Sequence, residues 1–254
     1  MLSKGKIQYL KSLQLKKFRE KSQEFIVEGP KLVAELLKSD FVVKSIFATS
    51  EWLKQNMDIA NGKIEIFEVS QSELNRISGF KTPNQLVALA EAKETNLILD
   101  DVLNDFSIVL DGISDPGNLG TIIRTADWYG FRKIICSNDT VEFLNPKIVQ
   151  SSMGSIFRVP VYYANIVDLI EKLRPDFPIY GTFMDGKNIY NESFNESGML
   201  ILGSESHGIS KNVEKLVKIR LHIPSVETKA ESLNVSVAGA ICCSEIKRSK
   251  LKNS

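Results

Sequence analysis

The sequence predicts an α/β protein of two domains, the second of which is built on a mainly parallel sheet. Short apolar runs alternate with segments of helical periodicity along most of the chain. In the second part several runs are continuously apolar, as in strands buried on both faces. Each loop of distinctive composition there follows such a strand, and ligands of parallel sheets bind beyond the carboxyl ends of strands.

The first part of the chain has the pattern of a compact α/β unit. Pro30 stands in the first turn of one predicted helix, where its fixed φ favours helix initiation. A stretch with three Asp, residues 91–105, follows this unit, and we place the domain boundary near Lys93. The predicted helices are residues 8–21, 30–39, 51–57 and 71–77, and the predicted strands are 24–27, 41–48, 64–69 and 85–90.

The second domain, residues 94–254, begins with a buried strand and ends with a long helix. Its strands and helices alternate, which favours a parallel sheet covered on both faces. The predicted strands are residues 106–110, 132–136, 157–162, 179–183, 199–202 and 219–223, and the predicted helices are 118–129, 145–152, 166–173 and 231–247.

Composition excludes several classes of protein. No apolar run approaches the length needed to cross a bilayer, and the N-terminus enters a charged stretch rather than an apolar signal core, so we expect a cytoplasmic protein without a membrane partner. The cysteines, Cys136, Cys242 and Cys243, are odd in number and include an adjacent pair, which argues against a disulfide framework. With only His207 and His222 beside them, no metal site is predicted.

Positive charge gathers at both ends of a chain whose net charge is only +1. Basic ends are typical of a protein that binds phosphate groups, and they are equally typical of solvated helix faces and a frayed tail. Seven basic residues precede position 22 against one acid, Glu20, and four close the C-terminus: Lys4, Lys6, Lys11, Lys16, Lys17, Arg19 and Lys21, then Lys247, Arg248, Lys250 and Lys252.

The loop after residues 106–110 is a candidate anion site. It is rich in Pro and Gly, leads into a helix, and places Asn118 and Arg124 on that helix. Free N–H groups at a helix start, the helix dipole and a nearby Arg together favour a phosphate or another negative group. A Gly-rich turn before a helix is, however, also an ordinary tight connection.

Two later loops also combine small and polar residues. Glu205 lies in a Gly-rich turn and is either a solvent-facing acid or an N-terminal partner of the next helix. Ser232 suits the N-cap of the last helix, and Asn234 could bond back to the backbone. His207, beside Glu205, is a candidate general base, although a surface role in the loop is favoured.

Taken together, the three loops resemble the signature motifs of the SpoU (TrmH-type) family of RNA ribose 2′-O-methyltransferases, in the SPOUT superfamily. Residues 152–160 also resemble the family, so that the similarity spans about 106–247. The matching positions are Asn118, Gly120, Arg124, Ala126 and Gly130 in the first motif, Gly203, Glu205 and Gly208 in the second, and Ile223, Pro224 and Ser232 to Ser236 in the third.

The resemblance implies a fold, an activity and partners. It implies a C-terminal SPOUT α/β domain with a trefoil knot and, in residues 1–93, an L30e-like domain that binds the RNA substrate. It further implies methyl transfer from S-adenosylmethionine to a ribose 2′-hydroxyl of RNA, with ribosomal RNA favoured over transfer RNA, and a homodimer.

The resemblance also assigns roles to residues. Arg124 would hold the RNA phosphate, with an electrostatic rather than a basic role, because its pKa normally lies above about 12. Asn118 would orient Arg124 or the ribose, Glu205 would fix its loop or pair with a cation, and Ser232 and Asn234 would shape the pocket. The backbone around Gly203, Ile223 and Leu233 would enclose the cofactor.

One departure from the family lies between Pro224 and Ser232, where a Gly is missing and the linker is one residue longer. This departure keeps open a non-catalytic RNA-binding protein on the same fold. A Rossmann-type dinucleotide or methyltransferase domain is a second alternative, but Gly117 to Gly120 does not supply the Gly-x-Gly-x-x-Gly fingerprint.

Overall fold

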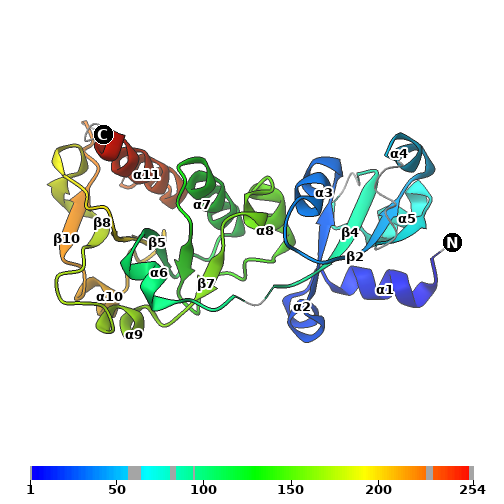
Figure 1. Cartoon of the computed structure of the whole chain (residues 1–254), viewed down its shortest axis with the longest axis horizontal. Coiled ribbons are helices and arrows are strands. Elements are labelled where there is room, and N and C mark those ends of the chain that lie inside the picture. Colours follow the sequence, from blue (N-terminus) through cyan, green and yellow to red (C-terminus); the bar gives the residue numbers. More distant parts are fainter. Residues whose placement is uncertain (1, 57–63, 81–83, 94, 227–230, 252–254) are drawn as a thin grey trace. The chain divides into compact units, whose positions relative to one another are not determined.

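The chain forms two compact units, which we describe separately. The computed structural model describes residues 2–56, 64–80, 84–93, 95–226 and 231–251 (Figure 1). The first unit comprises Met1–Glu94 together with Glu142–Arg158, and the second comprises Thr95–Val141 together with Val159–Ser254. Parts of three predicted segments lie outside the described residues: position 57 of the helix at 51–57, positions 227–230 of the linker after Pro224, and Lys252 of the basic tail.

The first unit contains a mixed four-stranded sheet in the order β1-β4-β2-β3. The central strand β4 is antiparallel to β1 and β2, while β2 and β3 run parallel. Phe47 on β2 is fully buried and stacks on Phe67 of β3 with ring centroids 4.9 Å apart. The strands are β1 (Glu24–Glu28), β2 (Val43–Ala48), β3 (Glu65–Glu68) and β4 (Leu86–Glu91).

Short helices accompany this sheet, and their starts follow the expected capping chemistry. Pro30 occupies the first turn of α3, and Ser70 and Glu73 form a capping box at the start of α5. The helical segments are α1 (Lys4–Ser12), α2 (Lys16–Ser22), α3 (Pro30–Leu37), α4 (Ser50–Gln55), α5 (Gln71–Ile77), α8 (Pro146–Ser151) and the 3₁₀ turn η2 (Ser155–Phe157).

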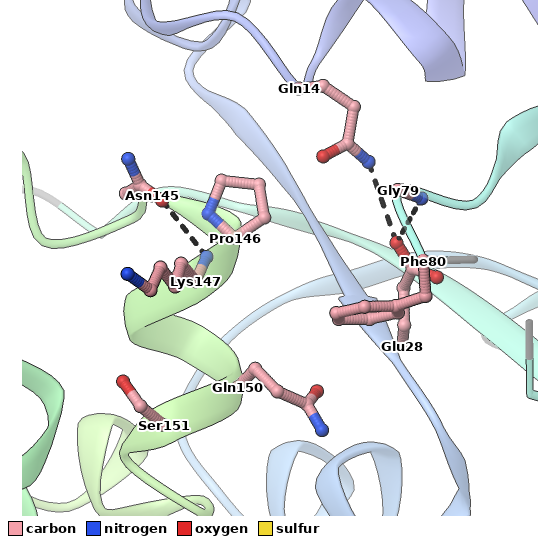
Figure 2. A pocket seen from close by; sticks show the side chains of 9 residues that line it. All are labelled: Gln14, Glu28, Gly79, Phe80, Asn145, Pro146, Lys147, Gln150 and Ser151. Carbon is pink, nitrogen blue, oxygen red and sulfur yellow. Dashed lines mark hydrogen bonds between the residues drawn. The ribbon is translucent and has the colours of Figure 1, made fainter. Parts of the chain in front are cut away.

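A cavity of about 360 Å³ lies within the first unit, where α8 faces the residues that follow α5 (Figure 2). Six of its nine described lining residues have polar side chains, among them Glu28 at the end of β1.

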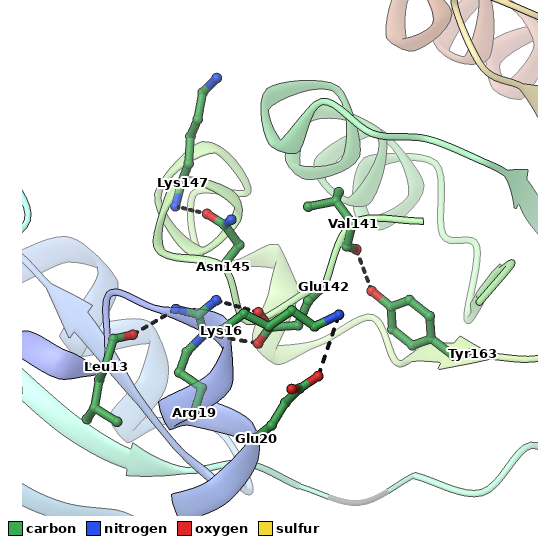
Figure 3. A network of polar contacts seen from close by, with 9 residues as sticks. All are labelled: Leu13, Lys16, Arg19, Glu20, Val141, Glu142, Asn145, Lys147 and Tyr163. Atoms are coloured by element: carbon green, nitrogen blue, oxygen red, sulfur yellow. Dashed lines mark hydrogen bonds and ion pairs between the residues drawn. The ribbon is translucent and has the colours of Figure 1, made fainter. Parts of the chain in front are cut away.

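The prediction of one helix over residues 8–21 is wrong, because the structure has two helices separated at Leu13 to Leu15. Leu15 is extended, with φ −102° and ψ 131°, and the fully buried Leu13 turns its carbonyl to Arg19, whose Nη1 donates to it at 2.7 Å. The buried Arg19 guanidinium also pairs with Glu142, with 3.0 Å between Nε and Oε1 (Figure 3). These tertiary bonds stabilise a break that contains neither Gly nor Pro, so apolar periodicity alone does not reveal it.

The second unit confirms the predicted parallel sheet. Its six strands follow the order β10-β8-β9-β5-β6-β7, and each neighbouring pair is parallel. The strands are β5 (Phe106–Asp111), β6 (Ile134–Cys136), β7 (Val161–Tyr163), β8 (Ile179–Asn188), β9 (Gly198–Gly203) and β10 (Ile219–His222).

Two long helices of this unit, α7 (Pro116–Trp128) and α11 (Val235–Leu251), pack against each other, and α11 also contacts β9. Gly239 lets α11 lie close to its neighbours, since a Cβ there would lie 2.9 Å from the Cδ1 of Leu202 on β9 and 3.9 Å from Ile122 on α7. The shorter helical segments are α6 (Leu99–Leu103), η3 (Ile189–Asn191), α9 (Ile166–Glu171) and α10 (Lys211–Glu214).

One more predicted strand is partly wrong, and two short helices were not predicted. The predicted strand at 157–162 is wrong in its first half, because Phe157 ends the turn η2 and β7 begins only at Val161. The short helices α6 and α10 are absent from the prediction. Within the described ranges, no helix is long and apolar enough to cross a membrane.

Candidate functional site

The first loop of the site joins β5 to α7. The helix begins at Pro116, two residues before the predicted start, because Asp115 caps it: its Oδ1 accepts the backbone N–H of Asn118 at 3.0 Å. An Asp at the N-cap followed by Pro at the first helical position is a standard start signal. Asn118 therefore lies in the first turn of α7, and it is almost fully buried.

The second loop follows β9, the strand that pairs with β5 in parallel register with Gly203 opposite Asp111. Gly203 is required here, because a Cβ would lie 2.1 Å from the carbonyl carbon of Gly208. Ser204 and Gly208 exchange backbone hydrogen bonds of 3.0 and 2.9 Å, and Gly208 has a φ of +66°. The turn that carries Glu205 is thus closed by its own backbone.

Asp111 links the first two loops. This buried carboxylate ends β5, and its Oδ2 accepts the backbone N–H of Ser210 at 2.7 Å. Neither Asp111 nor the cap Asp115 is among the site residues predicted from the sequence. A signal for Asp115 was present, namely an acidic residue directly before Pro at a helix start.

The third loop leads into α11, which begins at Val235 and not at the predicted Glu231. Ser232 is not its cap. The Oδ1 of Asn234 accepts from the backbone N–H of Ser236 at 2.9 Å and from the Ser236 hydroxyl at 2.6 Å, so Asn234 performs the capping. Ser232 is exposed, four residues closer to the linker than Ser236.

One side chain from each loop meets in a single set of hydrogen bonds. The Nδ2 of Asn118 donates to Oε1 of Glu205 at 2.9 Å. The Nδ2 of Asn234 donates to the same Oε1 at 2.6 Å and to Oδ1 of Asn118 at 3.0 Å. We call Asn118, Glu205 and Asn234 the amide–carboxylate cluster. It fixes the Glu205 carboxylate through one oxygen and leaves Oε2 without a bond to any described residue.

Arg124 does not join this cluster. It lies on α7 six residues after Asn118, and six residues turn an α-helix to another side. Its side chain is exposed, and within the described ranges it makes no hydrogen bond or ion pair. The guanidinium is therefore available to an anion, and Trp128, four residues further on and 85% exposed, stands on the same side of the helix.

The residues expected to enclose a cofactor flank the third loop. Ile223 follows β10 and is partly buried, and Leu233, just before α11, is 49% exposed. Both present apolar surface that the described residues leave uncovered. Gly203 lies at the end of β9, in the closed turn described above.

Neither His207 nor the cysteines join the cluster. His207 is exposed, and its Nδ1 shares a hydrogen bond of 2.7 Å with the Ser206 hydroxyl. Cys136, Cys242 and Cys243 are all buried, and burial raises the pKa of Cys242 to about 12, so that its thiol stays protonated. Among the described residues no group of His, Cys, Asp and Glu is placed to hold a metal ion.

Comparison with known proteins identifies the second part of the chain. Residues 105–244 match the sequence profile of the SpoU rRNA methylase family. The chain belongs to the SpoU rRNA methylase family. This confirms the resemblance seen in the three motifs and excludes the Rossmann-type alternative. Residues 4–88 match the MRM3-like substrate binding domain, which confirms the expected substrate-binding domain ahead of the SpoU methylase region.

Individual SpoU relatives are similar over nearly the whole chain. The 23S rRNA (guanosine(2553)-2′-O)-methyltransferase RlmP of Bacillus subtilis is 33% identical over 238 residues, which cover 93% of each chain. A solved structure of a TrmH-family protein from Porphyromonas gingivalis is 38% identical, with a TM-score of 0.86 over 98% of this chain and 99% of that one. The AdoMet-bound rRNA methyltransferase from Sinorhizobium meliloti is 27% identical, with a TM-score of 0.86 over 98% and 96% of the two chains.

Proposed function

We propose that this SpoU protein transfers a methyl group from S-adenosylmethionine to a ribose 2′-hydroxyl of ribosomal RNA. The observation that carries the proposal is the amide–carboxylate cluster. Three motif residues from three separate loops, Asn118, Glu205 and Asn234, bond to one another beside the carboxyl ends of parallel strands. Ligand sites of such sheets lie at this edge. The name of the Bacillus subtilis relative supports ribosomal RNA over transfer RNA.

The residues around the third loop fit the proposed cofactor. An adenine needs apolar walls and a few backbone donors and acceptors. Ile223 and Leu233 supply uncovered apolar surface, and Gly203 begins a turn in which backbone groups approach closely. We assign these three residues to the cofactor, whose sulfonium supplies an electrophilic methyl group when bound.

The remaining motif residues would position the RNA. Arg124, exposed and without an internal partner among the described residues, would hold a phosphate. Asn118, Glu205 and Asn234 would orient the ribose, and Ser232 would line the approach to it. A ribose hydroxyl has a pKa far above neutrality, so its alignment matters more than a strong base, and the RNA phosphate would accept its proton.

We assign RNA binding to residues 1–93, with an L30e-like fold. We assign methyl transfer to residues 94–254, with a trefoil-knotted SPOUT fold. The match of residues 4–88 to a substrate binding domain supports the first assignment. The exposed basic side chains of α1 and α2, such as Lys11, Lys16 and Lys17, favour a phosphate-rich partner there.

We also propose a homodimer that works in the cytoplasm, where its ribosomal RNA substrate would be. Trp128 on α7 and Val237 on α11 are 85% and 48% exposed, on two helices that pack together. Large exposed apolar side chains on neighbouring helices favour a protein contact. A second copy of the chain would cover them and bring Arg124 beside the interface.

The decisive experiment has two parts. Calorimetry of the full chain with S-adenosylmethionine should show binding, and ribose-methylation mapping of ribosomal and transfer RNA should show one site lost from ribosomal RNA when the gene is deleted. Loss from transfer RNA instead would overturn the proposed substrate. RNA binding without cofactor binding or methyl transfer would overturn the enzyme and leave a non-catalytic RNA-binding protein.

A further inference from the structure

The cavity of the first unit has a lining unlike that of the site above. It has a volume of about 360 Å³, within the range of about 300 to 1,000 Å³ that small-molecule sites occupy. Among its described lining residues are three side-chain amides and one aromatic ring. The lining residues are Gln14 after α1, Glu28 of β1, Gly79 and Phe80 after α5, and Asn145, Pro146, Lys147, Gln150 and Ser151 at α8.

Glu28 holds one wall of this cavity in place. Its Oε1 accepts the backbone N–H of Gly79 at 2.9 Å and the Nε2 of Gln14 at 3.5 Å, and its Oε2 accepts the Ser78 hydroxyl. Glu28 itself is 5% exposed. These bonds fix the loop that carries Phe80, and they fix which end of the Gln14 amide faces Glu28 (Figure 2).

Three amides around the cavity keep hydrogen-bonding atoms uncommitted. Toward the described residues, Gln14 uses only its Nε2, which leaves its oxygen, and Asn145 uses only its Oδ1, in a bond of 2.9 Å from the Lys147 N–H, which leaves its Nδ2. The side chain of Gln150 makes no hydrogen bond within the described ranges. Partly covered amides without partners are costly unless a ligand or water satisfies them.

Phe80 adds an aromatic face. Its ring is half-buried, stacks on no other ring of the described residues, and extends toward α8 (Figure 2). An aromatic face beside amides that can donate and accept is the combination by which proteins bind unstacked bases. A free anion fits less well, because Glu28 lines the cavity and the ammonium of Lys147, the one cationic residue of the described lining, points away from Phe80.

We propose that this cavity binds one unstacked nucleobase of single-stranded RNA, with Phe80 stacking on the base and Gln14, Asn145 and Gln150 bonding its edge. The inference rests on the proposed function in taking RNA as the substrate. It adds a base-binding pocket in the first unit, which contains none of the motif residues proposed to position the ribose or the cofactor.

The first test uses the unmodified full chain. A ten-nucleotide single-stranded RNA that contains 5-iodouridine is irradiated with the protein, and the cross-linked peptide is mapped by mass spectrometry. We expect the cross-link at Phe80, since a stacked ring lies against the base. Cross-links confined to peptides outside the cavity lining would overturn the proposal, whatever the variants do.

The second test compares variants by fluorescence anisotropy with the same RNA. Phe80→Ala should weaken binding about tenfold, and Phe80→Tyr should keep the affinity, because stacking is the contribution removed. Gln150→Ala should weaken binding a few fold. Lys54→Ala, an exposed cation on α4 away from the cavity lining, is the control and should leave the affinity unchanged. Equal affinities for Phe80→Ala, Gln150→Ala and the wild type would overturn the pocket.

The outcome separates this inference from the proposed function. Cofactor calorimetry and methyl transfer test residues of the second unit, and Phe80→Ala should bind S-adenosylmethionine as the wild type does. If the wild type methylates ribosomal RNA and the cross-link avoids Phe80, only the pocket fails. If Phe80 cross-links and no methyl group is transferred, only the enzyme fails.

Discussion

Asn118 and Asn234 lie 116 positions apart in the chain, yet the Nδ2 of Asn234 donates to the Oδ1 of Asn118 at 3.0 Å. Both amides also donate to Oε1 of Glu205. Each bond fixes the orientation of an amide, because only its nitrogen donates and only its oxygen accepts. A change of polarity at any of these positions therefore affects the other two.

Asn118→Asp should reduce methyl transfer about ten- to a hundredfold. The substitution removes the donor to Glu205 and places a second carboxylate against it, and hydrogen bonds to charged groups are worth roughly 1.5–3 kcal/mol. The measurement is kcat/KM on ribosomal RNA. Asn212→Asp, on the exposed surface of α10, is the matched control and should keep full activity. Full activity in Asn118→Asp would contradict an orienting role for the cluster.

Arg124→Lys should lower kcat/KM about tenfold or more while cofactor binding stays unchanged. Lysine keeps the charge but loses the planar fork that binds phosphate oxygens in pairs. Arg132→Lys, also exposed in the same unit, serves as the control. Near-normal methylation by Arg124→Lys would show that the fork is not needed.

Gly203→Ala should destabilise the second unit by about 1–3 kcal/mol, the usual cost of an overpacked site. The new Cβ would fall 2.1 Å from the Gly208 carbonyl carbon, so backbone must move. We expect weaker cofactor binding by calorimetry and a lower midpoint of urea unfolding by circular dichroism. Gly5→Ala in α1, where nothing lies within 4 Å of the added Cβ, should not destabilise the protein. Equal midpoints for Gly203→Ala and the wild type would mean that the turn can open without cost.

Trp128→Lys should convert the proposed dimer to a monomer without unfolding the chain. A charge at the centre of an apolar contact is left without a partner, whereas a side chain that is 85% exposed in one chain contributes little to its own fold. Sedimentation velocity at micromolar concentration measures the change. Met184→Lys, at a position 68% exposed on β8, is the control and should sediment as the wild type does. A wild type that sediments as a monomer would contradict the proposed homodimer.

The sequence was sufficient for the parallel sheet and for the motif residues, because both leave local signals. Continuous apolar strands mark burial on both faces, and Asn118, Glu205 and Asn234 stand in recognisable loops. The features that could not be predicted from the sequence depend on contacts that form only in the folded chain. The break between α1 and α2 depends on Arg19 reaching Glu142, and the capping of α11 by Asn234 displaces Ser232 from that role. Capping propensity alone does not choose between two neighbouring polar residues.

Glu28 and Glu73 should give the stability of the first unit opposite dependences on pH. Burial is the main cause that raises the pKa of Glu28, against the bonds from Gly79, Ser78 and Gln14. Backbone hydrogen bonds from Ser70 and Leu2 lower the pKa of Glu73 from 4.5 to about 2. Because the pKa of Glu28 is raised in the folded state, its contribution to stability is complete below the unfolded pKa and is lost as the pH rises through the folded pKa. Because the pKa of Glu73 is lowered, its contribution is present above 4.5 and is lost as the pH falls toward about 2.

The free energy of unfolding of the wild type relative to Glu28→Gln should therefore fall as the pH rises above 4.5. Relative to Glu73→Gln it should rise as the pH increases from about 2 to 4.5. Urea unfolding followed by tryptophan fluorescence in a Trp128→Phe background isolates the first unit, because the remaining tryptophan, Trp52, is 6% exposed there. The pH-independent part of each substitution, such as the altered bonds to Gly79, shifts the curves without changing their slopes. Slopes of the same sign for the two variants would contradict the environments described here for both carboxylates.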